Sequence, residues 1–433
     1  MDPITVGLVG LVLLIIILFS RMPVGFVMAL LGFVGYIYLR SLEGGLHILA
    51  KDFYSTFGSY SLTVVPLFML MGQVAFYAGI SRRLFDTSYK FVGHLPGGLA
   101  MATVGASAGF AAICGSTNAS AATMAAVALP EMKRYKYSDD LSTGTVAAGG
   151  SLGILIPPSV IFIVYGLLTE QSIGRLFLAG IIPGILLAGM FAITIAIWVR
   201  LRPEIAPRGP KTTFKEKFRS LTGISETIVL FVLVMGGLFA GFFTPTEAGA
   251  IGAGGAILLG FITRRLTWKG FMQAAIDSTR LSCMVLVIVA GATIFGHFLA
   301  VSRIPYEIAT WVSGLPFSHA VIMMIIILIY LGGGCFIDAL ALIMLTIPIF
   351  FPVVTAMGYD PIWFGVIIVL VTQMGVITPP VGVNVYIVSG VAKDVPLETI
   401  FRGALPFLIA LIVTSLILIP LPQIALFLPG LMR

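Results

Sequence analysis

The sequence predicts an all-α protein that crosses a membrane many times and contains two inverted repeats, each with a re-entrant helical hairpin and a broken helix. Three observations predict this fold. Of the 433 residues, 59% are hydrophobic and 10% are charged, whereas soluble domains carry about 25% charged residues. Apolar runs of about 20 residues, long enough to cross a bilayer, recur along the chain. In each half, a Pro-Pro pair interrupts one long apolar segment, at 157–158 and at 379–380.

Ten apolar segments have the length and composition of membrane spans. They lie at about 4–20, 23–40, 59–80, 139–169, 176–199, 225–243, 247–263, 282–301, 361–391 and 405–428. The first has no basic stretch before it and no small-residue cleavage site after it, so we interpret it as a retained span. Amphipathic connectors are expected at about 42–58 and 266–281.

Two further apolar segments, 97–132 and 318–357, are expected to enter the membrane and return to the same side. Each has a weak point near its middle, where the sequence reads CGSTNAS in the first and GGGCFID in the second. Glycine and small polar residues favour a bend at such a point. We therefore interpret both segments as re-entrant helical hairpins.

Basic residues predict the orientation of these segments. The densest basic run, at 199–220, separates two apolar halves of similar length, so we place it in the cytoplasm. Of the 25 Lys and Arg residues, 20 then face the cytoplasm, which is the expected asymmetry. The exceptions are Arg40, Lys51, Arg175, Arg303 and Arg433. The net charge of +7 thus follows from the membrane topology, and nucleic acid is not an expected partner.

The two halves resemble each other at an offset of about 222 residues. GILIPP at 153–158 matches GVITPP at 375–380, and Pro130 matches Pro352. Chance similarity is the weaker explanation, because the matches involve Gly and Pro in one order. An odd number of crossings precedes the second copy, so the two copies have opposite orientations. Inverted repeats with discontinuous helices are typical of secondary transporters.

The broken helices are predicted to contribute to a binding site. A Pro-Pro pair removes two backbone donors and obstructs the preceding turn. The unpaired backbone groups cannot face lipid, so they must be buried in protein or line a polar cavity. Free carbonyls bind cations, and free N–H groups at helix starts bind anions.

Polar residues at the first hairpin bend are candidate ligands. Ser116, Thr117 and Asn118 follow one another there, and their oxygens can coordinate Na⁺ or bind a polar substrate. The alternative is that they cap the returning helix. The chain has one other asparagine, Asn384, just after the second break. We therefore expect both asparagines at a central site.

Asp338 is the only acidic residue that lies deep in an apolar segment. An intramembrane carboxylate is costly and is by default a functional hypothesis. It could ligate Na⁺, carry a proton or accept hydrogen bonds from substrate hydroxyls, or it could cap the second helix of its hairpin. Thr378 lies at the second break, where the first repeat has Ile156, so the two halves are expected to differ chemically.

Enzyme activity is not predicted. The sequence has no G-x-x-x-x-G-K-[ST] loop and no H-E-x-x-H pair. Asp338 has no intramembrane acidic partner with which to form a protease dyad. The cysteines Cys114, Cys283 and Cys335 form no C-x-x-C pair, so neither disulfides nor zinc are expected. No cofactor other than a coupling ion is predicted.

Four segments carry a family resemblance. They are CGSTNASAATMAAVALPEM, GGSLGILIPPSVIFIVYG, GGGCFIDALALIMLTIPIFFPVV and MGVITPPVGVNVYIVSGVAKDVPLETIFRGALPFL. They resemble the large membrane subunit of tripartite ATP-independent periplasmic (TRAP) transporters, and the resemblance runs over essentially the whole chain. It implies a multi-pass protein of the bacterial inner membrane that imports an organic acid with a Na⁺ gradient. It also implies two partners, a periplasmic binding protein and a small four-helix membrane subunit.

The resemblance further implies an elevator-type division into a scaffold and a mobile transport domain. The transport domain is expected over 85–185 and 305–405. The scaffold and its arms are expected over 1–84 and over 186–304, which includes the cytoplasmic loop. A C-terminal span is expected over 406–433.

Site residues are carried over by the same resemblance. One Na⁺ site is expected at Gly115, Ser116, Asn118, Gly153 and Pro157. A second is expected at Gly334, Cys335, Asp338, Gly375 and Thr378. Substrate is expected between the hairpin tips, at Ser116, Thr117, Asn118, Asp338 and Thr378. Sialic acid, C4-dicarboxylates and related carboxylates all fit such a site. The alternatives are a stand-alone carboxylate or anion carrier with the same two hairpins and, from a different class, a channel or a scaffold protein.

Overall fold

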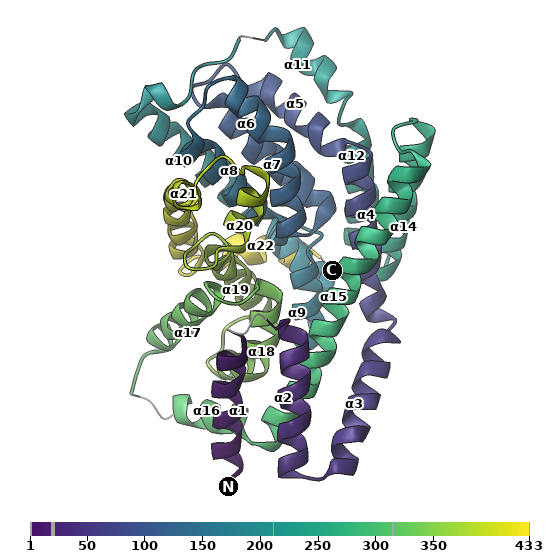
Figure 1. The fold of residues 1–433 in the computed structure, drawn as a ribbon, viewed down its shortest axis with the longest axis vertical. Helices are drawn as coiled ribbons and strands as arrows, with labels where there is room; N and C mark the ends of the chain where they lie inside the picture. The colour runs from purple at the N-terminus through teal and green to yellow at the C-terminus, as the bar shows by residue number, and fades with distance from the viewer. Residues whose placement is uncertain (1, 19–21, 211, 314–315, 433) are drawn as a thin grey trace.

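The structure is a computed structural model that describes residues 2–18, 22–210, 212–313 and 316–432. Every regular element in this part of the chain is a helix (Figure 1). Five helices are long and apolar enough to cross a membrane, or up to seven if each of two bent pairs forms one span. The prediction of an all-α polytopic membrane protein is confirmed. The end of the first predicted span, 19–20, lies outside the described residues.

The first repeat contains ten α-helices. Their bounds are α1 Pro3–Leu18, α2 Val24–Leu39, α3 Leu42–Phe57, α4 Val64–Tyr77, α5 Ile80–Val92, α6 Gly98–Cys114, α7 Thr117–Arg134, α8 Asp139–Ser151, α9 Val160–Leu168 and α10 Ile173–Leu201. Short 3₁₀ turns lie at Ser61–Thr63, Leu152–Ile154 and Pro203–Ile205. A helix of the loop between the repeats, α11, spans Phe214–Leu221.

The second repeat follows the same order of helices. Their bounds are α12 Ser225–Phe231, a π-helical stretch Val232–Gly236, α13 Gly237–Phe239, α14 Pro245–Ile262, α15 Trp268–Val301, α16 Ile304–Ser313, α17 His319–Gly334, α18 Ala339–Ala356, α19 Pro361–Gly375, α20 Val383–Val391, α21 Leu397–Leu418 and α22 Gln423–Leu431. The starts of α14, α17, α18 and α19 lie 221, 221, 222 and 222 residues after the starts of α2, α6, α7 and α8. The repeat is therefore present in the helices as well as in the motifs.

The predicted hairpins and broken helices correspond to pairs of helices. The hairpin at 97–132 consists of α6 and α7, and the hairpin at 318–357 consists of α17 and α18. The broken helix at 139–169 consists of α8 and α9, and that at 361–391 consists of α19 and α20. Each hairpin therefore precedes the broken helix of its own repeat.

The largest departure from the predicted elements is α15. The sequence suggests a connector at 266–281 before a span at 282–301, but the structure has one helix of 34 residues, Trp268–Val301. No proline interrupts this segment, so the helix can continue through it. The corresponding segment of the first repeat is divided into α3 and α4, which are bent by 55°.

The predicted bounds of the last span, 405–428, are wrong. It begins earlier, at Leu397, and is divided into α21 and α22. Pro420 and Pro422 lie at the division. A proline cannot donate the hydrogen bond that would continue the helix, so the helix ends before this pair.

The helices form two groups that differ in what they pack against. In the first group, α15 packs along α2 and α4, and α4 also packs against α14. In the second group, α8 packs against α7 and α21, and α17 and α21 pack against α19. The first group lies along the right-hand and lower parts of Figure 1, and α5 to α8, α10 and α21 lie in the upper left.

The centre of the second group is formed by two helices related by the repeat. All residues of α8 from Leu141 to Ser151 are buried, and so are all residues of α19 from Ile362 to Gly375. A helix that is apolar or small on every side and buried all round belongs to a protein core. The two broken helices therefore pass through the interior of the molecule; the first break is buried there, whereas Pro379 and Pro380 of the second break are exposed.

The loop between the repeats runs along α5, the helix that joins α4 to α6. Hydrogen bonds connect the two at intervals of about one turn, pairing Gly93 with Gly209, Lys90 with Thr212, Thr87 with Ser220 and Arg83 with Gly223. Residues at this spacing lie on one face of a helix. The loop is therefore bound along the length of α5.

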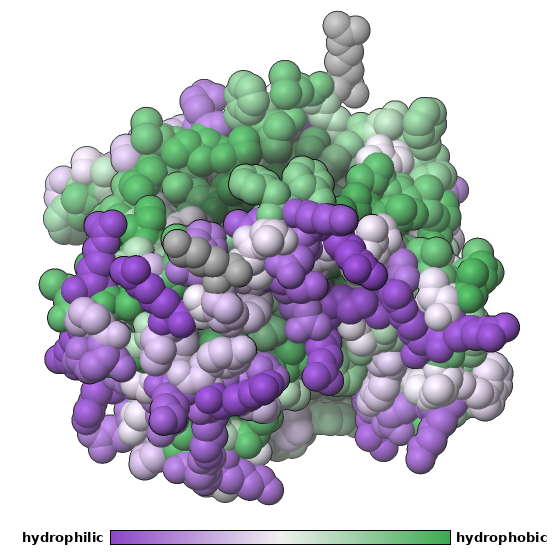
Figure 2. Space-filling view, turned by 90° about the horizontal axis from the view of Figure 1, so that it is seen from above, coloured by the Kyte–Doolittle hydropathy of each residue, from purple (hydrophilic) through white to green (hydrophobic). Residues whose placement is uncertain are grey.

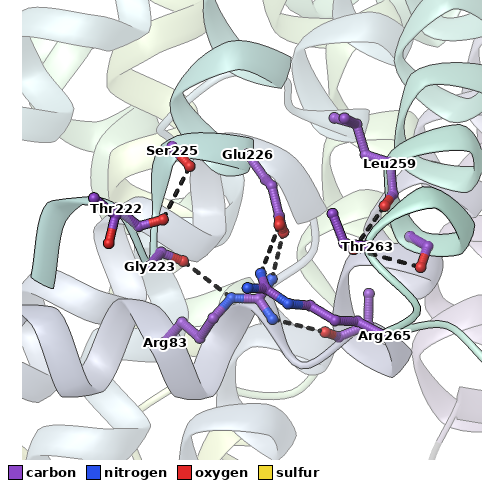
Figure 3. A network of polar contacts seen from close by, with 10 residues as sticks. Arg83, Thr222, Gly223, Ser225, Glu226, Leu259, Thr263 and Arg265 are labelled. Atoms are coloured by element: carbon purple, nitrogen blue, oxygen red, sulfur yellow. Dashed lines mark hydrogen bonds and ion pairs between the residues drawn. The ribbon is translucent and has the colours of Figure 1, made fainter.

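Three charged side chains form a network where this loop ends and α12 begins (Figure 3). The Glu226 carboxylate lies 2.8 Å from the Arg83 guanidinium and 2.6 Å from that of Arg265. Only 16% of the Glu226 side chain is exposed. Burial lowers the pKa of Arg83, and the charge of Glu226 opposes that shift. The network joins α5, α12 and the turn between α14 and α15.

We expect Glu226→Gln to destabilise the protein by about 1–2 kcal/mol, less than for a fully buried pair because water reaches these side chains. The neutral amide would leave two guanidinium groups facing each other without a counter-charge. Thermal unfolding in detergent measures the effect. The matched control is Glu398→Gln, which removes an exposed ion pair with Arg402 and should shift nothing measurable. Equal shifts in both variants would contradict the prediction.

Candidate functional site

The two hairpin bends meet at a small cavity of about 70 Å³. Its polar lining comes from both hairpins, at Ser116, Thr117, Asn118 and Asp338. Its remaining lining is apolar or backbone, at Met69, Gly115, Ile154, Val160, Ile161, Leu281, Met284, Val285, Ala339 and Leu340. The cavity therefore lies between the two hairpins and the first break on one side and α4 and α15 on the other.

The first bend is held tightly against the first break. Gly115 ends α6 with a φ of +64°, which favours glycine, and a Cβ there would lie 2.5 Å from the Pro158 carbonyl oxygen. Ser116 is the N-cap of α7, and its hydroxyl accepts a hydrogen bond of 3.4 Å from the Ala119 N–H. The bend is thus a helix cap and a wall of the cavity at once.

Thr117 ties this bend to the second repeat. Its hydroxyl donates a hydrogen bond of 3.0 Å to the Asn384 Oδ1, and the Asn384 Nδ2 donates one of 2.9 Å to the Ala147 carbonyl oxygen. Asn384 is completely buried. It joins α20, α7 and α8, and it is not part of the cavity lining. The sequence predicts Asn384 at the central site. The structure places it beside the cavity, where its hydrogen bonds link three helices.

We expect the Thr117–Asn384 hydrogen bond to appear as energetic coupling. Asn384→Ala should cost about 1–3 kcal/mol, because it leaves the buried Thr117 hydroxyl without an acceptor. Thr117→Val removes that hydroxyl, so the double variant should be more stable than the sum of the single effects by about 0.5 kcal/mol or more. A double-mutant cycle of unfolding free energies measures this. Strict additivity would mean that the two side chains are not coupled.

Asn118 presents an open acceptor at the site. Its Oδ1 is buried and has no hydrogen-bond partner among the described residues. Leaving a buried acceptor unpaired costs about 1–3 kcal/mol. Such an oxygen at a cavity wall is suited to a cation or to a donor of a bound ligand.

Asp338 caps a helix and also lies at the cavity wall. Its Oδ2 accepts a hydrogen bond of 3.1 Å from the Leu340 N–H, so it caps α18. It also lines the cavity between the bends and a larger one of about 610 Å³. The larger cavity lies between this hairpin, the turn from α1 to α2, and α15, and Met284 borders both cavities.

At both predicted ion sites, the hairpin bend contacts the break of its own repeat through a backbone N–H and a carbonyl oxygen. In the first repeat, the Val160 N–H lies 3.5 Å from the Gly115 carbonyl oxygen. In the second, the Val381 N–H lies 3.3 Å from the Cys335 carbonyl oxygen. These contacts bring the backbone of each bend against the backbone of the break in the same repeat.

Glycines make these approaches possible. A Cβ on Gly153 would lie 2.6 Å from the Ser116 carbonyl oxygen, and one on Gly375 would lie 2.2 Å from the Gly334 carbonyl carbon. No side chain fits at those distances. Glycine is therefore required in both clusters for the backbones to meet.

Three other predicted residues lie outside the cavity, with Thr378 and Pro157 at the breaks and Cys335 at the second hairpin bend. The Thr378 hydroxyl donates a hydrogen bond of 2.5 Å to the Met374 carbonyl oxygen of its own helix, and the Cys335 thiol faces the Leu331 carbonyl oxygen at 3.2 Å. Neither they nor Pro157 line the cavity between the bends.

Two parts of this region were not found in the sequence. The first is the apolar wall of α4 and α15, formed by Met69, Leu281, Met284 and Val285, which no motif distinguishes from other apolar spans. The second is a buried contact of 3.5 Å between the Ser151 hydroxyl and the Gln373 Oε1. These two residues are 222 apart, so the repeat offset itself could have paired them.

Inverted repeats with broken helices are the common plan of membrane transporters. Two solved transporters share this fold. The YdaH transporter of Alcanivorax borkumensis superposes with a TM-score of 0.63 and 15% identity, over 90% of this chain and 88% of that one. MtrF of Neisseria gonorrhoeae gives a TM-score of 0.58 and 14% identity, over 98% and 95%. At these identities the likeness concerns the fold alone.

Sequence comparison identifies the family. Residues 11–424 match the family of the tripartite ATP-independent periplasmic transporter, DctM component. The C4-dicarboxylate TRAP transporter large permease protein DctM of Pseudomonas aeruginosa is 37% identical over 88% of this chain and 89% of its own. The sialic acid TRAP transporter large permease protein SiaM of Vibrio cholerae is 35% identical over 96% of both. This chain belongs to the large permease subunits of TRAP transporters.

Membership of this family confirms the resemblance read in the sequence. The chain is a transport protein of the bacterial inner membrane and not an enzyme. The family description makes it one component of a three-part system.

Proposed function

We propose that this permease moves an organic acid into the cell together with Na⁺ by an elevator-type movement. The observation that carries the proposal is the cavity shared by both hairpin bends. Its polar residues all come from the hairpins, and its opposite wall on α4 and α15 is apolar. Substrate and ions would therefore be held by one group of helices only.

The apolar wall supports movement of that group as a unit. Met69, Leu281, Met284 and Val285 offer no hydrogen bonds or charges to the hairpin bends. Sliding of the bends along this wall breaks no directional interaction at the wall itself, whereas the bends stay hydrogen-bonded to their own breaks. The transport domain is proposed over 85–185 and 305–405, and the scaffold over 1–84 and 186–304, with the C-terminal span at 406–433.

Two Na⁺ ions would occupy the contacts between bend and break. The first site is proposed at Gly115, Ser116, Asn118, Gly153 and Pro157, and the second at Gly334, Cys335, Asp338, Gly375 and Thr378. Their support is the contact of each bend with the break of its own repeat, at Gly115 and at Cys335, together with the unpaired Asn118 oxygen. Oxygen ligands from carbonyls, hydroxyls and carboxylates suit hard cations.

Substrate and partners follow from the family. The relatives are named for C4-dicarboxylates and sialic acid, and a related carboxylate is proposed here. It would bind at Ser116, Thr117, Asn118 and Asp338, with Thr378 behind them. A periplasmic binding protein would deliver it, and a small four-helix membrane subunit would brace the scaffold.

Uptake into proteoliposomes tests the proposal. The chain, with the small subunit, should accumulate labelled C4-dicarboxylate or sialic acid only when an inward Na⁺ gradient and the cognate binding protein are both present. Saturable, gradient-dependent uptake with a fixed ratio of substrate to Na⁺ would exclude a channel. Gradient-driven uptake without any binding protein would favour the stand-alone carrier. Uptake that does not respond to Na⁺ would overturn the coupling.

A further inference from the structure

The helix α11 is hydrogen-bonded to α5. The buried Thr87 hydroxyl of α5 donates a hydrogen bond of 3.0 Å to the Ser220 carbonyl oxygen, and Ser220 is buried. The start of α11 is closed by a capping box between Thr213 and Glu216. The helix therefore has a defined inner face, against α5, and a defined outer face.

The outer face of α11 carries two large aromatic side chains. Phe214 is 81% exposed and Phe218 is 69% exposed, and the two lie one turn apart. Lys215 and Arg219 are exposed beside them. The Lys217 ammonium lies 5.8 Å from the centre of the Phe214 ring. Two adjacent phenylalanines on a polar loop form an apolar patch that water covers poorly.

The charge around this patch is strongly positive. Residues 208–219 contain five basic side chains, at Arg208, Lys211, Lys215, Lys217 and Arg219, and one acid, Glu216. Glu216 takes part in the cap of α11, because its carboxylate accepts a hydrogen bond of 2.8 Å from the Thr213 N–H. Aromatic residues combined with lysine and arginine are the composition of helices that lie in a membrane interface.

The position of α11 suits contact with a membrane. It lies at the upper edge of the molecule, outside α5 (Figure 1). Seen from above, hydrophilic residues cover one side of this end and hydrophobic residues cover the other (Figure 2). The loop lies on the side that the basic residues assign to the cytoplasm, where the leaflet carries anionic lipids.

We propose that the outer face of α11, formed by Phe214, Lys215, Phe218 and Arg219, docks on anionic lipid headgroups of the cytoplasmic leaflet. The phenylalanines enter the interface, and the basic side chains bind lipid phosphates. Because the same loop is hydrogen-bonded along α5, bound lipid also holds α5 at the membrane surface.

Hydrogen exchange of the full chain in lipid nanodiscs tests the proposal. Amides of residues 212–222 should exchange more slowly in discs of phosphatidylcholine mixed with phosphatidylglycerol than in phosphatidylcholine alone. We expect about a fivefold difference for each basic side chain that engages the surface. The difference should shrink at high salt, because ions screen it. Equal exchange in both lipids would overturn the proposal.

Variants separate lipid binding from folding and from other ligands. Lys215→Gln with Arg219→Gln should abolish the lipid dependence, and so should Phe214→Ser with Phe218→Ser. The control, Lys136→Gln with Lys393→Gln, removes the same charge from exposed sites elsewhere and should keep the dependence. Slower exchange on adding millimolar inorganic phosphate to neutral discs would indicate a free anion site, and slower exchange only on adding the small subunit would indicate a protein partner. Either result would contradict lipid docking.

Discussion

An Asp338→Asn variant is expected to fold normally and to lose most of its transport. Asparagine replaces aspartate well as a helix cap, so the hydrogen bond to the Leu340 N–H and the start of α18 are retained. The negative charge is lost at a position that faces both cavities. Interactions with a charged group contribute about 1.5–3 kcal/mol. The initial uptake rate in proteoliposomes should therefore fall by about 10- to 100-fold.

The matched control for this prediction is Asp360→Asn. Asp360 caps α19 by accepting hydrogen bonds of 2.7 Å and 3.1 Å from the Ile362 and Trp363 N–H groups, and it lies outside the site. This variant should transport at the wild-type rate. If Asp338→Asn also transports at that rate, with unchanged dependence on Na⁺, the assignment of Asp338 to ion or substrate binding is wrong.

A Gly144→Ala variant is expected to lose much of its stability. In the structure, a Cβ on Gly144 would lie 2.1 Å from the Gly403 carbonyl oxygen. The obstacle is backbone on both sides, so α8 and α21 must move apart in the core of the second group of helices. Overpacking of this kind costs about 3 kcal/mol or more. Thermal unfolding in detergent should show a transition several degrees below that of the wild type.

Gly189→Ala provides the control for Gly144→Ala. Gly189 lies within α10, and nothing is within 4 Å of the Cβ that alanine would add. Alanine favours a helix more than glycine by up to about 1 kcal/mol, so this variant should be equally or more stable than the wild type. A Gly144→Ala protein with the unfolding temperature of the wild type would show that the close crossing of α8 and α21 does not exist.

The proposed site is asymmetric although the frame that holds it is repeated. The first bend supplies hydroxyl and amide oxygens, and the second supplies the Asp338 carboxylate. The bridge from Thr117 to Asn384 links the first bend to the second repeat. This hydrogen bond connects the first hairpin to the broken helix of the second repeat, and it is compatible with the proposed movement of both as one unit.

The sequence alone determined the class of fold, the repeat and most of the polar residues at the site. Membrane spans follow from apolar length, and breaks and bends follow from Pro-Pro pairs and glycine-rich turns, because these signals are local in the chain. Ser116, Asn118 and Asp338 were visible because polar side chains are rare in apolar segments. These features need no knowledge of which helices touch.

Only the tertiary structure decided how those pieces meet. The structure joins the predicted connector at 266–281 to the following span as one helix, α15, which packs along α2 and α4. The apolar wall at Met284, the burial of Asn384 and the turn of Thr378 toward its own helix all depend on contacts between residues far apart in the chain. An isolated helix satisfies its own backbone, so its sequence does not state which neighbour its side chains will face.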